Sequence, residues 1–172
     1  HGILRRHHTT RVGTLNCQSA RRPGDVELLA QDMDAEGLDI CALQETREIG
    51  QGSRQVTTSE GRVWSYLWSG DPSRKEQGVG FLLSPEAAKC ILGQPVLVSD
   101  RLIALTLDGL TRITLVCAYA PPENHRKDTK DAFYSDLLNT LIGRIARGGE
   151  VVLAGFYTAP VSFAFPPAFM KE

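Results

Sequence analysis

RVGTLNCQSARRPGDVELLAQDMDAEGLDICALQET, residues 11–46, is the most clearly patterned stretch of the chain. Residues 11–16 have the composition of a short strand. A helical pattern begins at Asp25, with its apolar residues on one face, and ends at Gly37. Residues 38–43 are apolar again and predict a second strand. A strand, a helix and a strand in so short a span predict a βαβ unit with parallel neighbouring strands, and therefore an α/β fold.

Beyond this unit, the pattern predicts a series of strands separated by turn residues. Residues 47–62 are polar and rich in glycine, serine and threonine, so we expect a loop there. Asp108 and Gly109 are expected to join the last two strands of the series as a hairpin, which adds an antiparallel section. The predicted strands are residues 63–68, 79–83, 95–98, 102–107 and 112–118.

A second, longer helix is predicted after these strands. Asp128 or Thr129 is the expected N-cap, and Gly148 and Gly149 are expected to end the helix. Residues 151–153 predict one more strand. The predicted organisation is a basic N-terminal arm over residues 1–10, a partial domain over 11–159 and an irregular tail over 160–172.

Length and composition place the chain among single-domain globular proteins. It has 172 residues, of which 42% are hydrophobic and 23% charged, and it contains no low-complexity block. No apolar run approaches the roughly 18 residues that cross a bilayer, which argues against a membrane span. The chain has neither a dinucleotide-binding glycine motif nor a P-loop, which leaves those nucleotide sites unsupported.

The four cysteines, Cys17, Cys41, Cys90 and Cys117, are widely spaced and form no CxxC pair of the kind that binds zinc. Three of them lie in apolar, strand-like runs, so we expect buried and reduced thiols. Reduced thiols are typical of an intracellular protein, in the nucleus or the cytoplasm.

Charge is distributed unevenly along the chain. The net charge is −1, but residues 1–22 hold five arginines and no acidic residue. The remaining 150 residues, with 14 basic and 20 acidic side chains, carry −6. A basic arm on an acidic body is able to contact the phosphates of a nucleic acid, but charge alone favours a solvated terminus. The arginines considered for such contact are Arg5, Arg6, Arg11 and, in a later loop, Arg74.

Residues just beyond the carboxyl ends of strands are candidates for a site, because open α/β sheets bind their ligands there. Asn16 ends the first strand, Gln44 and Glu45 end the second, and Tyr119 ends the hairpin strand. A carboxylate beside amide side chains suits Mg²⁺, which prefers oxygen ligands and keeps waters that it shares with a phosphate. Taken singly, Glu45 is also explained as a solvated turn residue, Asn16 as a turn former and Tyr119 as a packing residue.

Several segments occur together in the order and spacing of a known protein family. By these segments the chain resembles the endonuclease/exonuclease/phosphatase family over residues 11–159. Within it, the chain is similar to the apurinic-type endonuclease domains of non-LTR retrotransposons and to craniofacial development protein 2-like relatives. The segments are TLNCQSA, ICALQET, WSGDPSRKEQGVGFLLS, SDRLIALTL, VCAYAPPE and VVLAG.

This resemblance implies a four-layer α/β sandwich of the DNase I-like type, with mixed sheets, that cleaves phosphodiesters with Mg²⁺ or Mn²⁺. Carried over by motif, Glu45 of LQET would be the metal-binding carboxylate, and Asn16 of TLN would hold the metal or the phosphate region. Tyr119 of AYAP would contact the scissile phosphate. Nucleic acid, DNA rather than RNA, is the implied partner, and no membrane is implied.

The last predicted strand departs from the family pattern. Relatives read LAGDFNA where this chain reads LAGFYTA, so Phe156 replaces the water-orienting Asp and Thr158 replaces the supporting Asn. The family also has a second half with its own sheet and an Asp-His pair, whereas this sequence ends at Glu172. These differences predict weak metal binding, little or no cleavage, and an apolar sheet face open to water and to self-association.

Three functions remain open from the sequence. The first is an impaired or pseudogene-like copy of a Mg²⁺-dependent endonuclease domain. The second is a non-catalytic module that holds nucleic acid through its basic arm, which salt-dependent DNA binding without cleavage would identify. The third is a phosphodiesterase completed by another chain, which restored cleavage on mixing with a C-terminal half would identify.

Overall fold

A computed structural model describes residues 9–156 of the chain, and its first elements form the predicted βαβ unit. Strand β1 (Val12–Asn16) is followed by helix α1 (Asp25–Ala35) and strand β2 (Ile40–Gln44). The two strands run parallel and pair residue by residue, so that Asn16 lies opposite Gln44. The last residues of both strands therefore meet at one edge of the sheet, which positions the polar residues that follow them.

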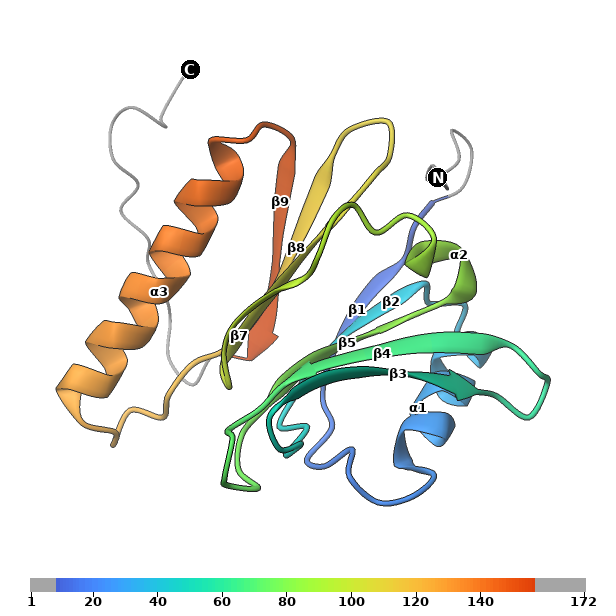
Figure 1. The fold of residues 1–172 in the computed structure, drawn as a ribbon, viewed down its shortest axis with the longest axis horizontal. Helices are drawn as coiled ribbons and strands as arrows, with labels where there is room; N and C mark the ends of the chain where they lie inside the picture. The colour runs from blue at the N-terminus through green and yellow to red at the C-terminus, as the bar shows by residue number, and fades with distance from the viewer. Residues whose placement is uncertain (1–8, 157–172) are drawn as a thin grey trace.

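The first sheet has five strands in the order β1-β2-β5-β4-β3 (Figure 1). Strands β4 (Val63–Ser69) and β5 (Val79–Leu83) lie within a residue of their predicted bounds. β5 pairs antiparallel with both β2 and β4, which makes this sheet mixed. All five residues of β2 and all five of β5 are buried, because both faces of the sheet are covered.

The structure corrects the loop expected over residues 47–62, because β3 (Gln51–Thr57) lies within it. β3 is the edge strand of the first sheet and pairs antiparallel with β4 along its whole length. Val56 is its only buried residue. An edge strand of this kind lacks the alternating apolar pattern by which strands are recognised in a sequence.

The second sheet has four strands in the order β6-β7-β8-β9. β7 and β8 are antiparallel, whereas β8 and β9 are parallel and are joined through α3, so the chain repeats the strand-helix-strand unit. The connection between β7 and β8 is longer than the predicted Asp108–Gly109 turn, because β8 begins only at Ile113. The remaining elements are α2 (Pro85–Ala88), β6 (Val96–Ser99), β7 (Leu102–Leu107), β8 (Ile113–Tyr119), α3 (Lys127–Ile145) and β9 (Glu150–Phe156).

Helix α3 begins earlier than its sequence pattern predicts. Arg126 is the N-cap and makes no side-chain capping hydrogen bond, so neither Asp128 nor Thr129 is the cap. Asp128 lies instead in the first turn of the helix and forms an ion pair with Arg126 at 2.7 Å. A carboxylate in the first turn is favourable beside the positive end of the helix dipole, so the acidic residue contributes there without capping.

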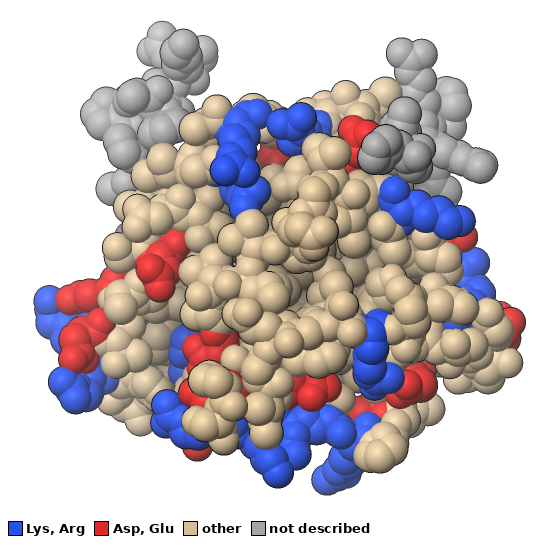
Figure 2. All heavy atoms as spheres, in the orientation of Figure 1, with Lys and Arg blue, Asp and Glu red and all other residues tan. Residues whose placement is uncertain are grey.

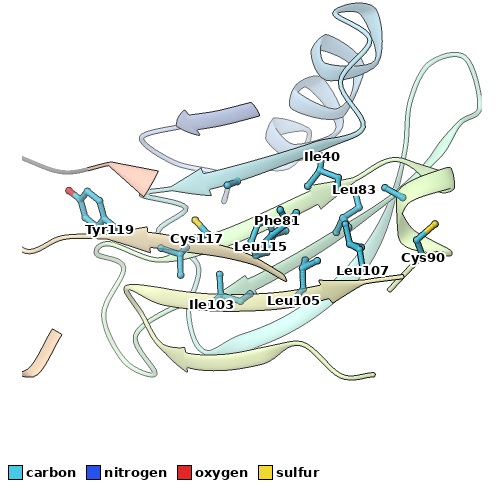
Figure 3. Packing of buried hydrophobic residues seen from close by; sticks show 13 residues of the cluster. Ile40, Phe81, Leu83, Cys90, Ile103, Leu105, Leu107, Leu115, Cys117 and Tyr119 are labelled. Atoms are coloured by element: carbon cyan, nitrogen blue, oxygen red, sulfur yellow. The ribbon is translucent and has the colours of Figure 1, made fainter. Parts of the chain in front are cut away.

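The two sheets pack face to face and each carries a helix on its outer face, which gives four layers. Figure 3 shows the apolar cluster between the sheets, where Ile40 and Phe81 of the first sheet meet Leu115 of the second. Val26 of α1 packs on the outer face of the first sheet, and Leu137 of α3 packs on the outer face of the second. The fold is therefore the α/β sandwich with mixed sheets that the sequence predicted.

The expectation of an apolar sheet face open to water is wrong. Strands of the second sheet, which this chain itself supplies, cover the inner face of the first. Ile40 and Phe81 are fully buried, and Leu115 is 1% exposed. Self-association through an uncovered sheet face therefore has no basis in the described residues.

The two ends of the chain add little to this description. Of the predicted arm over residues 1–10, only the last two positions are described, and the predicted tail over 160–172 lies outside the described residues. Among residues 9–156, no helix is long and apolar enough to cross a membrane.

Candidate functional site

Three strands from both sheets end at the same place. Asn16 is the last residue of β1, Gln44 the last of β2 and Tyr119 the last of β8, and Glu45 follows directly after β2. β1 and β2 are parallel neighbours, and β8 lies across the sandwich from them. The carboxyl ends of these strands thus bring together the side chains that the sequence singled out.

The carboxylate of Glu45 is the centre of this group. Its Oε1 atom accepts hydrogen bonds from Asn16 Nδ2 and from the Tyr119 hydroxyl, each at 2.9 Å. Its Oε2 atom lies 3.3 Å from Nη2 of Arg47, with the Glu45 side chain 21% exposed. One carboxylate therefore joins three segments of the chain and keeps partial access to solvent.

These contacts shift two pKa values in opposite directions. The hydrogen bond from Asn16, assisted by those from Tyr119 and Arg47, lowers the pKa of Glu45 in spite of its partial burial. Burial, together with the hydrogen bond to the negative Glu45, raises the pKa of Tyr119. At neutral pH the pair is therefore an ionised carboxylate and a neutral phenol.

The backbone around Glu45 is held in an unusual conformation. Glu45 and Arg47 have φ of 55°, in the left-handed region that residues other than glycine seldom adopt. Two backbone hydrogen bonds secure the segment, from Thr46 N to Gly78 O at 3.1 Å and from Arg47 N to Gln77 O at 2.7 Å. A Cβ atom on Gly78 would collide with Thr46 Oγ1, so glycine is required there. Such strain, of about 1–3 kcal/mol per residue, is typical of functional sites.

Gln44 lies beneath Glu45 and connects the two sheets. It is 1% exposed, and its Nε2 donates to the Cys117 Sγ across the sandwich at 3.3 Å. The same amide donates to Thr14 Oγ1 at 3.1 Å. Gln44 therefore links the two sheets beneath the site. Its side chain has no exposed group left to contact a ligand.

Arg101 is a site residue to which the sequence assigned no role. It lies in the turn between β6 and β7 and is 7% exposed. Its Nη1 donates to the carbonyl oxygen of Tyr119 at 3.2 Å, and its guanidinium carbon lies 5.2 Å from the centre of the Tyr119 ring. The only sequence signal is a charged residue in a short turn between two apolar strands, within the SDRLIALTL segment.

A polar cavity of about 460 Å³ adjoins the site on the side of Arg101. His125 and Arg74 also line it, and Arg74 forms ion pairs with Asp71 at 3.4 Å and with Glu76 at 4.0 Å. The carboxylates of Asp71 and Glu76 therefore offset the positive charge of Arg74.

The other predicted contact residues are not brought to the site. Arg11 precedes β1 and so lies at the opposite end of that strand from Asn16, with its backbone N–H bonded to Asp39 at 2.9 Å. Arg5, Arg6 and Thr158 lie outside the described residues. Phe156, the last residue of β9, is the register partner of Tyr119. The strand position next to Tyr119 thus holds a residue without a metal-binding group.

The donor set at Glu45 permits only sparse metal coordination. Glu45 supplies a carboxylate and Asn16 an amide oxygen, which are ligands of the type that Mg²⁺ and Mn²⁺ take. Arg47 competes for the second carboxylate oxygen. No group of three or more His, Cys, Asp or Glu side chains able to hold a metal occurs between residues 9 and 156. The residues fit a divalent ion that keeps most of its water ligands.

The sequence and the fold were compared with known proteins. Residues 13–155 match the profile of the endonuclease/exonuclease/phosphatase family. The chain is 31% identical over 152 residues to a Rhodobacter capsulatus protein named 2-desacetyl-2-hydroxyethyl bacteriochlorophyllide A dehydrogenase, covering 72% of this chain and 47% of that protein. It is 26% identical over 131 residues to craniofacial development protein 2 of Tragulus javanicus, covering 76% and 22%.

A solved structure shares the fold. The AP endonuclease from Archaeoglobus fulgidus superposes with a TM-score of 0.52 at 20% identity, over 86% of this chain and 56% of that one. The chain thus spans about half the length, or less, of these three proteins. Because the family profile covers most of the chain and the four-layer fold agrees with it, the chain belongs to the endonuclease/exonuclease/phosphatase family.

Proposed function

We propose that this chain carries part of a phosphodiester-cleaving site that uses Mg²⁺ or Mn²⁺ and acts on nucleic acid, and that the chain by itself cleaves little. The observation that carries the proposal is the ionised Glu45 carboxylate, which accepts two hydrogen bonds at the carboxyl ends of strands from both sheets. Among the proteins of similar fold is an AP endonuclease, which favours DNA over RNA as the substrate of this proposal.

Glu45 and Asn16 are the residues that would hold the ion. Asn16 donates through Nδ2. Its Oδ1 atom accepts from Gln18 N at 3.2 Å and from no other group within residues 9–156, so it keeps a lone pair for a cation. When bound, the ion would supply positive charge that offsets the charge developing on the phosphate during cleavage. With one carboxylate in the set, binding should be weak.

Tyr119 would contact the phosphate through a change of hydrogen-bond partner. Its hydroxyl proton points to Glu45 Oε1, and a phosphate oxygen is itself an acceptor. The hydroxyl can therefore donate to a phosphate only by turning away from Glu45. Turning away leaves Glu45 Oε1 with the hydrogen bond from Asn16 Nδ2 at 2.9 Å.

The expected low activity follows from the end of β9. The family pattern has an Asp where this chain has Phe156, the register partner of Tyr119. Losing a general base typically lowers a rate by about 10²–10⁴-fold, and the Asn position, Thr158, is changed as well. Both changes remove polar groups that a water molecule and a transition state would use.

Metal binding and plasmid nicking together test this function. Titration with Mn²⁺ should show weak binding that disappears in Glu45→Ala and persists in Glu36→Ala, an exposed acidic residue at the end of α1. The unaltered chain should nick supercoiled plasmid barely above background, and Phe156→Asp with Thr158→Asn should raise the rate. Metal binding that is unaffected by Glu45→Ala would overturn the proposed site, and efficient nicking by the unaltered chain would overturn the impaired activity.

A second candidate function is nucleic-acid binding without cleavage. The loop between β1 and α1 carries Arg21 and Arg22, both exposed, and Ala20 N in the same loop donates to Thr46 O at 2.9 Å. Two exposed basic side chains thus lie on a loop fastened to the site. Retention of an oligonucleotide that weakens steeply with salt, with no cleavage in either chain, would favour this function.

A further inference from the structure

A second cavity, of about 290 Å³, lies at the far end of the molecule from Glu45. Thr114 lines it near the start of β8, five residues before Tyr119, which corresponds to a separation of roughly 17 Å along the strand. Three arginines line the cavity. Arg112 precedes β8, and Arg144 and Arg147 lie at the end of α3. Figure 2 shows blue side chains gathered at the top of the view, over this end of the molecule.

The three arginines have no acidic partner. None of them forms an ion pair with any residue of the described range, and no carboxylate lines the cavity there. Arg112 Nη1 donates to Arg147 O at 3.4 Å, whereas the side chains of Arg144 and Arg147 donate to no described atom. Other arginines of the chain differ, since Arg54 pairs with Glu27 at 2.6 Å. The guanidinium groups of Arg144 and Arg147, two residues that line the cavity, therefore keep donors that no described residue uses.

Like charges crowd one another at this place. Partial burial lowers the pKa of Arg144, and the nearby charge of Arg147 lowers it further. The negative end of the α3 dipole explains a basic residue in the last turn of the helix. The helix dipole does not explain the presence of Arg112, which precedes β8 and lies outside α3. Arg144 and Arg147 therefore repel each other in the folded chain, and a bound anion would relieve that repulsion.

Two hydroxyl groups complete the lining. Thr106 of β7 and Thr114 of β8 are register partners, and their Oγ1 atoms lie 3.1 Å apart. Both residues line the cavity with the arginines. In such a pair one hydroxyl donates to the other, and the second keeps a proton for an outside acceptor. The cavity thus offers one neutral donor beside the cationic ones.

We propose that this cavity binds a phosphate group. A phosphate carries more charge than a carboxylate and presents several oxygens, so it can engage guanidinium forks from two sides together with a hydroxyl. The group comes either from free phosphate or from the backbone of a nucleic acid, and the chemistry of recognition is the same. The site is separate from Glu45 and does not depend on the function proposed above.

Titration calorimetry on the full chain tests the site with two probes, inorganic phosphate and a short single-stranded DNA. The Arg144→Gln, Arg147→Gln double variant should weaken phosphate binding by at least about tenfold, since each lost charge-assisted contact is strong. The matched control is Arg126→Gln at the other end of α3, where Arg126 already pairs with Asp128. Circular dichroism and the melting temperature show whether each variant folds.

The acidic residue next to this cluster along the chain provides a variant of opposite effect. Glu150 begins β9, and its N–H donates to Arg112 O at 2.8 Å. Glu150→Gln removes a negative charge three residues from Arg147 in the sequence and should tighten phosphate binding. Equal weakening of phosphate and DNA by the double variant identifies a backbone phosphate as the ligand, and weakening of phosphate alone identifies the free ion. Absence of saturable phosphate binding, or equal binding by the folded double variant, would overturn the site.

Discussion

Arg101, in the turn between β6 and β7, holds Tyr119 at the end of β8 by three contacts, although the two residues lie 18 positions apart. The carbonyl of Arg101 accepts from Tyr119 N at 2.9 Å, its Nη1 donates to Tyr119 O at 3.2 Å, and its guanidinium lies over the Tyr119 ring. These contacts hold the backbone and the ring of Tyr119 in place, and the Tyr119 hydroxyl donates to Glu45 Oε1. Arg101 is thus a positioning residue for the site.

Arg101→Gln should destabilise the fold by about 1.5–3 kcal/mol, because the nearly buried carbonyl of Tyr119 loses a charged donor. Urea unfolding followed by fluorescence measures this change. Arg22→Gln is the control, since Arg22 is exposed and makes no side-chain hydrogen bond within the described range, and it should change stability by less than about 0.5 kcal/mol. Equal unfolding midpoints for the two variants would contradict the role of Arg101.

Glu45→Gln should lower the pKa of Tyr119, because the negative carboxylate is one of the two main causes that raise it, after burial. A phenol with a raised pKa stabilises the fold below its ordinary value of about 10, and that stability is lost as the pH rises through the folded value. The variant should therefore lose stability at a less alkaline pH than the unaltered chain. The ring-carbon resonance of labelled Tyr119, followed by NMR, reports the titration directly, and an unchanged midpoint would refute the coupling.

Arg47→Gln should tighten the binding of Mn²⁺ if Glu45 holds the ion as proposed. The guanidinium lies 3.3 Å from Glu45 Oε2 and competes with a cation for that oxygen. The Arg47 side chain is 47% exposed, and an exposed ion pair contributes no more than about 1 kcal/mol, so the gain should be at most about fivefold. Electron paramagnetic resonance of free Mn²⁺ measures it. Arg126→Gln, whose side chain pairs with Asp128 and forms no ion pair with Glu45, should have no effect, and a loss of affinity in Arg47→Gln would speak against the metal site.

Phe81→Ala should cost about 3–5 kcal/mol of unfolding free energy, because Phe81 is fully buried between the two sheets. Leu110→Ala is the matched control, since Leu110 is 70% exposed and should contribute less than about 0.5 kcal/mol.

Thermal denaturation of the unaltered chain should show one cooperative transition, with little binding of a dye that reports exposed apolar surface. Strong dye binding before the transition would mean that the sheets do not stay packed.

Much of the secondary structure follows from the sequence alone, because one-sided burial imposes a repeating apolar pattern on a strand or helix. The βαβ unit, β5 and β7 were predicted within a residue or two of their bounds for this reason. The motifs around Glu45 and Tyr119 identified the family. β3 was not predicted, because an edge strand with one buried side chain lacks the repeating apolar pattern.

Tertiary structure alone decided which of these residues meet. Asn16 and Glu45 are 29 positions apart, and Glu45 and Tyr119 are 74 apart, so their hydrogen bonds depend on strand register and on the packing of one sheet against the other. Packing also buried the sheet face that sequence reasoning left open, and it placed Arg101 on Tyr119. Periodicity reports which face of an element is buried, but not what covers it, and only the folded chain brings distant side chains into contact.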